Sequence, residues 1–235
     1  MVDEVLAEPT DAEAIFLSVE GVPAGRPVMF GDVFRDLKCS RGGSISPLVM
    51  VMSHPCSMRR GVVLKERILT AEVAGFAQKL SSTRWQNGYF DFFPVPGCDL
   101  DDRIAVNLTE LHSANSSDLL IANRVMALSD YGVTVLLQRW IYQMSRDPVD
   151  LRELEELVAP VMAEIELQEL WCEAALRKHA EPSTTADLIL NESIAFQDFI
   201  GVRGDGGLRD QMQDPARRAA ARRATRERIE QRFGV

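Results

Sequence analysis

The sequence is poor in the residues from which metal centres and nucleophilic sites are usually built. Its 235 residues include three histidines and four cysteines. The cysteines are unevenly spaced and none belongs to a Cys-x-x-Cys pair, which zinc sites and redox motifs commonly use. In the absence of an export signal we expect free thiols in a reducing cytoplasm.

A basic leader and long apolar runs are also missing. The chain starts with the acidic stretch MVDEVLAEPTDAEA, which lacks the basic region and apolar run of a signal peptide. The longest unbroken apolar run of the region 30–65 covers residues 47–52, which is far too short to cross a bilayer. We therefore expect a cytoplasmic protein that does not engage a membrane.

Positive charge is scarce and unevenly distributed. The formal net charge of -9 argues against a surface that binds nucleic acid throughout, since phosphate binding needs concentrated Lys and Arg. Residues 216–235 nevertheless contain seven arginines and two glutamates.

With 46% hydrophobic residues, the chain can bury the core of one large domain, or of one compact domain with an appendage.

Short strand-forming segments separated by Gly and Pro turns fill the first half of the chain. Residues 47–53 are continuously apolar, which predicts a strand buried on both faces. Helical spacing predicts a short helix at 70–80, and the aromatic segment 85–95 favours core packing over a base-stacking platform. The expected strands are 14–19, 28–37, 47–53, 61–68, 85–95, 104–108 and 124–128.

The hydrophobic period becomes helical from residue 129. We expect helices at 129–146, at 151–178 with a break near Pro160, at 186–200 and at 215–233, with a glycine-rich linker at 201–214. Strands followed by helices indicate the α+β class, here a small SH3-like β-barrel followed by a helical C-terminal region. The expected divisions are a flexible acidic N-terminus (1–12), a barrel domain closed by a helix (13–146), a helical extension (147–200), the linker (201–214) and an arginine-rich helix (215–235).

Two motifs in the opening region resemble a known family. A strand that begins Gly31-Asp32-Val33-Phe34 is followed by a glycine-containing loop and by the strand 46–53, SPLVMVMS. This pattern is similar to the start of PemK/MazF-type toxins. The resemblance implies an SH3-like barrel, cleavage of single-stranded RNA and pairing with an acidic antitoxin. Ser46 stands where that family carries an arginine.

Three arginines flank the buried strand and are the first candidate site. Arg41, Arg59 and Arg60 lie in or just after the turns on either side, so they could converge at one end of the barrel and hold a phosphate bidentately. The alternative is three solvated arginines paired with the abundant carboxylates.

His54 and Cys56 form a second candidate site. Cys56 could act as a nucleophile with His54 or His112 as its base, because nearby arginines favour a thiolate. The same pair could bind zinc with Cys39 or Cys98, but the chain supplies no second tight pair of ligands. The alternative is that Cys39 and Cys56 are small buried hydrophobic residues, and we expect no cofactor.

The terminal helix is the third candidate. Arg218, Arg222 and Arg226 are four residues apart and Arg223 adjoins them, so one helix face is densely positive. This face could bind nucleic acid. The acidic remainder of the chain favours docking on the acidic helices of residues 150–173, in the same chain or in a second copy.

These observations favour a protein-interaction or regulatory component built on a PemK/MazF-like barrel. Its partner would be another protein or a second copy, bound through the C-terminal helices. The resemblance places it in a bacterial toxin–antitoxin or phage-defence setting. The alternative is a metal-independent endoribonuclease that acts on single-stranded RNA through Arg41, Arg59 and Arg60, with His54 and Cys56 nearby.

Overall fold

The computed structural model of the chain describes residues 6–9, 14–18, 21–38, 45–60, 62–75, 91–95, 104–179 and 185–234. The chain divides into two compact units. The first, called the sheet unit, comprises Met1–Val22, Val28–Met58 and Leu64–Leu157. The second, called the helical unit, comprises Pro23–Pro27, Arg59–Val63 and Val158–Val235. Strands precede most of the helices, which confirms the α+β class.

A seven-stranded antiparallel sheet forms the sheet unit. Its order is β1-β9-β2-β3-β6-β8-β7. The strands are β1 (Phe16–Ser18), β2 (Val33–Lys38), β3 (Ile45–Val51), β6 (Arg67–Gly75), β7 (Phe92–Pro94), β8 (Ile104–Asn115) and β9 (Arg124–Leu128). Between β3 and β6 lie the one-turn helix α1 (Pro55–Met58) and a two-stranded sheet of β4 (Arg59–Arg60) and β5 (Val63–Leu64).

The central strand β3 is buried on both faces, as its unbroken apolar sequence predicts. Val49, Met50, Val51 and Met52 have no exposed side-chain surface. Successive strand residues point to opposite faces, so full burial of neighbours requires cover on both sides. Val49 and Val51 belong to a core cluster that also takes Met58 of α1. The helical turn after His54 thus places an apolar side chain against the sheet.

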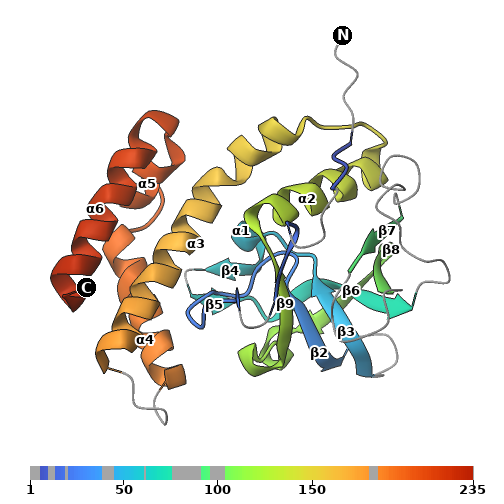
Figure 1. Cartoon of the computed structure of the whole chain (residues 1–235), viewed down its shortest axis with the longest axis horizontal. Helices are drawn as coiled ribbons and strands as arrows, with labels where there is room; N and C mark the ends of the chain where they lie inside the picture. Colours follow the sequence, from blue (N-terminus) through green and yellow to red (C-terminus); the bar gives the residue numbers. More distant parts are fainter. Residues whose placement is uncertain are drawn as a thin grey trace. The chain divides into compact units, whose positions relative to one another are not determined.

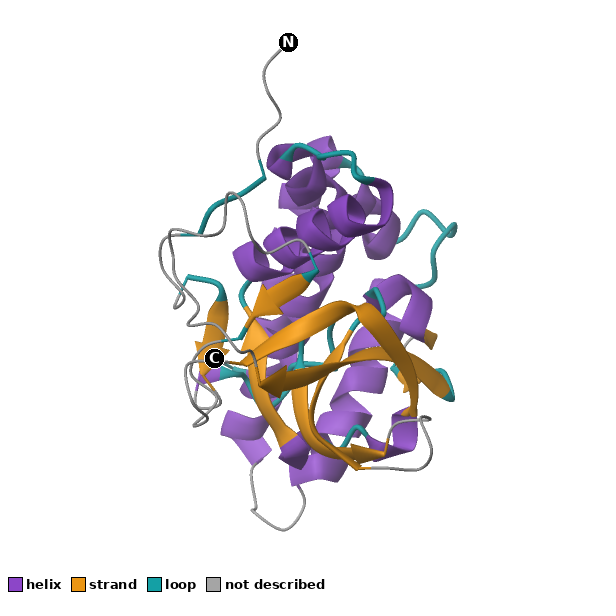
Figure 2. Cartoon of the chain, turned by 90° about the vertical axis from the view of Figure 1, so that its right-hand side faces the viewer, coloured by secondary structure: helices purple, strands orange, loops and turns teal. Residues whose placement is uncertain are grey.

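The sheet is strongly curved, as Figure 2 shows, but the pairing of the described strands does not close into a barrel. The order begins at β1 and ends at β7, with no ladder between them among the described residues. Side chains of the two end strands nevertheless meet. The rings of Phe16 and Phe93 pack edge to face with centroids 6.2 Å apart. The curvature therefore brings the two edges of the sheet within side-chain reach.

Several strand boundaries differ from the sequence predictions, and the helix expected at 70–80 is wrong. Residues up to Gly75 continue β6, while 76–80 lie outside the described residues. The register of β6 against β8 shifts between Ala71 and Val73, and such a bulge locally breaks the two-residue alternation of the strand. The strand expected at 61–68 is divided between β5 and β6, and β8 extends to Asn115.

A tight turn, rather than a strand, precedes β2. Gly31 adopts φ +87°, and a Cβ atom there would lie 2.1 Å from Leu128 Cδ1. Asp32 is fully buried, and its carboxylate accepts a hydrogen bond from the Met29 amide at 2.9 Å and pairs with Arg124 Nη1 at 3.0 Å. This ion pair joins β2 to β9, which are neighbours in the sheet. The glycine and the aspartate are thus required by the turn itself.

Helix α2 (Asp130–Ser145) begins at the predicted position and is anchored to the segment before β1. The Ser129 hydroxyl caps it by accepting from the Gly132 amide at 3.0 Å, and donates to the Ala14 carbonyl at 2.6 Å. A Cβ atom on Gly132 would lie 2.1 Å from the Ile15 carbonyl oxygen. Glycine is therefore needed for this close approach of helix and strand.

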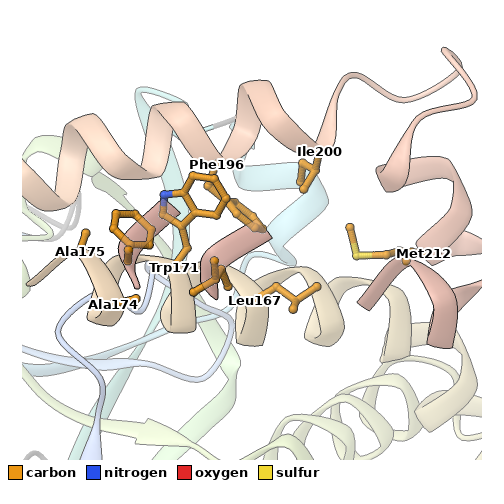
Figure 3. Packing of buried hydrophobic residues seen from close by; sticks show 10 residues of the cluster. Leu167, Trp171, Ala174, Ala175, Phe196, Ile200 and Met212 are labelled. Atoms are coloured by element: carbon orange, nitrogen blue, oxygen red, sulfur yellow. The ribbon is translucent and has the colours of Figure 1, made fainter. Parts of the chain in front are cut away.

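The helical unit gathers three helices on the C-terminal part of α3 (Leu151–His179). They are α4 (Thr185–Ile200), α5 (Leu208–Gln213) and α6 (Pro215–Phe233), which Figure 1 shows on one side of α3. Trp171 of α3 is 1% exposed and lies in the middle of their common core (Figure 3). Among the helices of the described residues, none is both long and apolar enough to traverse a bilayer.

Two helical predictions need correction. Helix α3 runs through Pro160 without the expected break, although a proline there removes one intrahelical hydrogen bond. The expected linker 201–214 contains α5. Its first part is also ordered, because the Asp210 carboxylate accepts hydrogen bonds from the amides of Gly204 at 2.9 Å and Gly206 at 2.6 Å.

The buried pair of Asp32 and Arg124 leads to the first prediction. Arg124→Ala removes the cationic partner of a fully buried carboxylate, and we expect the free energy of unfolding to fall by about 3–5 kcal/mol. Urea denaturation followed by circular dichroism measures this loss.

The matched control is Arg177→Ala, because Arg177 pairs with Glu173 at the surface with 67% of its side chain exposed. Its cost should be about 0.3–0.5 kcal/mol. The double variant Asp32→Asn/Arg124→Met should lose less than Arg124→Ala, since it leaves no isolated buried charge. Equal losses for Arg124→Ala and Arg177→Ala would contradict a structural role for the pair.

Candidate functional site

The structure describes only part of the sites predicted around the buried strand. Arg41, Cys39 and Cys98 lie outside the described residues, and of Cys56 only the backbone, in α1, is described. His54 is half-buried, and its carbonyl accepts from the Ser57 amide at 2.8 Å and hydroxyl at 2.7 Å. Burial lowers the pKa of the His54 imidazole below its ordinary 6.5, so the ring is neutral at pH 7. His54 thus supports the turn into α1 through its backbone.

Arg59 and Arg60 are neighbours on β4. Arg59 is half-buried and Arg60 is exposed. Adjacent strand residues project to opposite faces, so these two guanidinium groups begin on different sides of the strand. Arg59 and Arg60 belong to the helical unit and His54 to the sheet unit. The convergence of the three arginines stays a prediction.

The described residues allow two statements about metal ligands and thiols. Within the described ranges, no three His, Cys, Asp or Glu side chains gather where they could hold a metal ion. Cys172 is buried in the helical unit, and burial raises the pKa of its thiol. A Cβ atom on Gly25 would lie 2.4 Å from Cys172 Cβ, which shows how closely Pro23–Pro27 packs on α3. Cys172 is therefore a packing residue.

The arginines of α6 dock on the acidic helix of the same chain. Arg222 and Arg226 both pair with the carboxylate of Glu166 in α3, and Arg226 Nη2 lies 2.6 Å from Glu166 Oε1. Arg218 donates to the Met212 carbonyl at 2.9 Å. The intrachain form of the docking hypothesis therefore matches these contacts. Arg223 is exposed, with no partner among the described contacts.

A groove runs between α3 and α6 next to this ion-pair cluster. It has a volume of about 370 Å³. Its apolar lining is Leu170, Ala174 and Ile229, and its charged lining is Glu166, Arg177, Arg226 and Glu230. The groove thus offers room for an apolar side chain between groups of both charges.

The outer face of α4 carries projecting side chains, in contrast to the groove between α3 and α6. Leu190 and Ile194 are four residues apart and are 53% and 42% exposed. Asp187, Asn191 and Asp198 are exposed and share this face at spacings of three, four and seven residues. Two apolar side chains therefore project from the helical unit between two carboxylates.

Polar contacts fix the helices that carry the groove and this face. Arg209 of α5 pairs with Glu164 of α3 at 3.0 Å, and Gln197 of α4 donates to Glu164 and Gln168 at 3.2 Å each. Each of these groups has a partner on another helix, as a partly buried polar layer requires. These hydrogen bonds and the ion pair therefore orient α4 and α5 on α3.

Comparisons with protein-family models and with curated proteins found no match to this chain. The sequence indicated the arginines of α6 but not their partner, because the acidic helix offers several carboxylates and only the packing selects Glu166. The spacing of Arg222 and Arg226, one helical turn apart, is the signal that both can reach one carboxylate.

The ion pairs of Glu166 lead to a prediction about how the free energy of unfolding depends on pH. Partial burial acts to raise its pKa, but the hydrogen bonds from Arg222 and Arg226 outweigh it and hold the pKa below its ordinary 4.5. A lowered carboxyl pKa stabilises the fold above the unfolded-state value, and this contribution is lost as the pH falls through the folded-state value. We expect Glu166→Gln to lower the unfolding free energy by about 0.5–1 kcal/mol at pH 7, discounted for solvent exposure.

The measurement is chemical denaturation of the wild type and Glu166→Gln between pH 7 and pH 3. The difference between them should shrink below pH 4.5 and vanish once Glu166 is protonated. The matched control is Glu227→Gln, an exposed carboxylate on the same α6, which should show no such difference. A difference that is independent of pH would contradict the ion-pair explanation.

Proposed function

We propose that this protein is a protein-interaction component whose helical unit binds other polypeptides, in the first place a second copy of itself. The groove between α3 and α6 carries this proposal. Its size suits one or two aliphatic side chains, and its charged lining includes Arg177 and Arg226 beside Glu166 and Glu230. The outer face of α4 supplies Leu190 and Ile194 between Asp187 and Asp198.

The two surfaces are complementary in shape. A projecting pair of apolar side chains fits a groove with an apolar lining, and the carboxylates of the α4 face can join Arg177 and Arg226, which already pair with Glu173 and Glu166. Because both surfaces belong to the same chain, two copies can exchange the contact reciprocally about a twofold axis. Hydrophobic burial then supplies affinity and the charges supply orientation.

For the sheet unit we propose the finer fold that the sequence suggested, an SH3-like barrel of the PemK/MazF kind. Its support is the contact of Phe16 and Phe93 across the two end strands and the turn at Gly31 and Asp32 that the resemblance includes. A bacterial toxin–antitoxin or phage-defence setting is the biological context that this resemblance implies. In such a setting an interaction component would act through its partner.

An endoribonuclease that acts on single-stranded RNA is the second candidate. The observation in its favour is the neutral imidazole of His54, since a general base must be unprotonated at the working pH. Arg60 is exposed and could contact phosphate.

Self-association tests the first candidate. We expect sedimentation velocity to show a concentration-dependent shift between about 1 μM and about 1 mM, which spans binding free energies of about −8 to −4 kcal/mol. Leu190→Asp and Arg177→Glu should each reduce the shift, because one removes an apolar contact and the other reverses a charge on the groove.

Leu157→Asp is the matched control, since Leu157 is 71% exposed but belongs to the sheet unit. The charge exchange Asp187→Lys/Arg177→Glu should restore part of the association that Arg177→Glu loses. A protein that stays monomeric throughout, or equal effects of Leu190→Asp and Leu157→Asp, would overturn the proposed interface.

RNA cleavage separates the two candidates. We expect a single-stranded RNA ladder to stay intact with excess protein in the presence of a chelator. Cleavage that Arg59→Ala and Arg60→Ala abolish, and that the exposed control Arg217→Ala retains, would instead establish the endoribonuclease.

A further inference from the structure

A short N-terminal segment is held on α2 in the way that a protein holds a peptide ligand. The Ala7 amide donates to Gln138 Oε1 at 2.7 Å, and Arg139 Nη2 donates to the Ala7 carbonyl. Gln138 is 1% exposed and Arg139 has no exposed surface. Two adjacent buried side chains of α2 therefore satisfy both backbone polar groups of one residue that lies more than 130 positions away in the sequence.

Contacts other than those of the N-terminal segment set the orientation of Gln138. Its Nε2 donates to the Val149 carbonyl at 2.7 Å, in the connection between α2 and α3. An amide whose nitrogen is committed in this way presents its oxygen in a defined direction. The acceptor for the Ala7 amide is thus preorganised, whether or not the segment is bound.

The flanking residues define the chemistry that the site accepts. Leu6 is 9% exposed and Pro9 is buried, so two apolar side chains anchor the segment. Glu8 interacts electrostatically with Arg139. Because Glu8 precedes a proline, its backbone is biased toward the extended conformation. The bound pattern is an extended apolar-x-Glu-Pro sequence.

We propose that this site on α2 is a peptide-binding site, and that Leu6–Pro9 is its intramolecular occupant, which an extended acidic peptide of the same pattern displaces. Backbone hydrogen bonds recognise an extended peptide of almost any sequence, while the two apolar positions and the acidic residue select among peptides. The proposal concerns the sheet unit and is independent of the interface proposed for the helical unit.

Full-length variants of residue 7 test it. Ala7→Pro removes the amide that donates to Gln138, whereas Ala7→Gly retains that amide. The probe is a fluorescein-labelled peptide of residues 1–12, and binding is measured by fluorescence anisotropy. We expect the peptide to bind Ala7→Pro at least about tenfold more tightly than the wild type or Ala7→Gly, because a tethered competitor acts at an effective concentration of about 1 mM.

Glu8→Lys is a second way to open the site in the full-length chain, since it places a like charge opposite Arg139 without altering the backbone. It should also increase binding of the wild-type peptide. Peptides that carry Ala7→Pro or Glu8→Lys should bind the opened chains at least about tenfold more weakly. Equal binding of the wild-type peptide to all four chains, or no binding to any of them, would overturn the proposal.

Discussion

The helical unit depends on the position of one indole. The ring of Trp171 contacts three phenylalanine rings at centroid distances of 5.4–5.8 Å, two from α4 and one from α6. Its Nε1 donates to Glu192 of α4 at 2.8 Å, and Arg232 of α6 lies over its face at 5.3 Å. A single side chain of α3 thereby sets the distance and rotation of two other helices. The three phenylalanine rings that Trp171 contacts are Phe196 and Phe199 of α4 and Phe233 of α6.

The same packing holds the two walls of the groove. Phe233 and Ile229 hold α6 against α3 near Trp171, and Glu166 holds it by charge one to two turns earlier in α3. Leu170 and Ala174 of α3 and Ile229 of α6 line the groove. The groove therefore lies between helices that other contacts keep in place.

The charge of α6 acts mainly inside the protein. Arg222 and Arg226 share Glu166, and Arg232 pairs with Glu192 at 3.0 Å. Binding to nucleic acid depends on phosphate contacts that release counterions, and an arginine already paired with a carboxylate must first break that pair. The positive face expected from the sequence is thus partly neutralised by packing, while Arg223 stays exposed. The contacts of Arg222 and Arg226 with Glu166 match the docking hypothesis.

Much of the architecture could be predicted because periodicity and turn chemistry are local properties. The buried strand, the helix that begins after residue 129 and the helix that ends at Phe233 follow from apolar spacing and from composition. Features that depend on tertiary pairing could not be predicted. The register shift in β6 depends on its pairing with β8, and the curvature that joins Phe16 to Phe93 is a property of the whole sheet. The selection of Glu166 by two arginines likewise depends on how the helices pack.

The energetics of the proposed interface limit its strength. Leu190 and Ile194 are about half exposed, so burying the rest of each contributes about 0.6–1.6 kcal/mol. A single docked α4 face would therefore supply about 1.5–3 kcal/mol, which is less than the cost of about 4–15 kcal/mol for immobilising two molecules. A reciprocal arrangement doubles the gain for one such cost. Stable association through this surface thus requires the twofold exchange, or a partner that fills the groove with more apolar area than α4 provides.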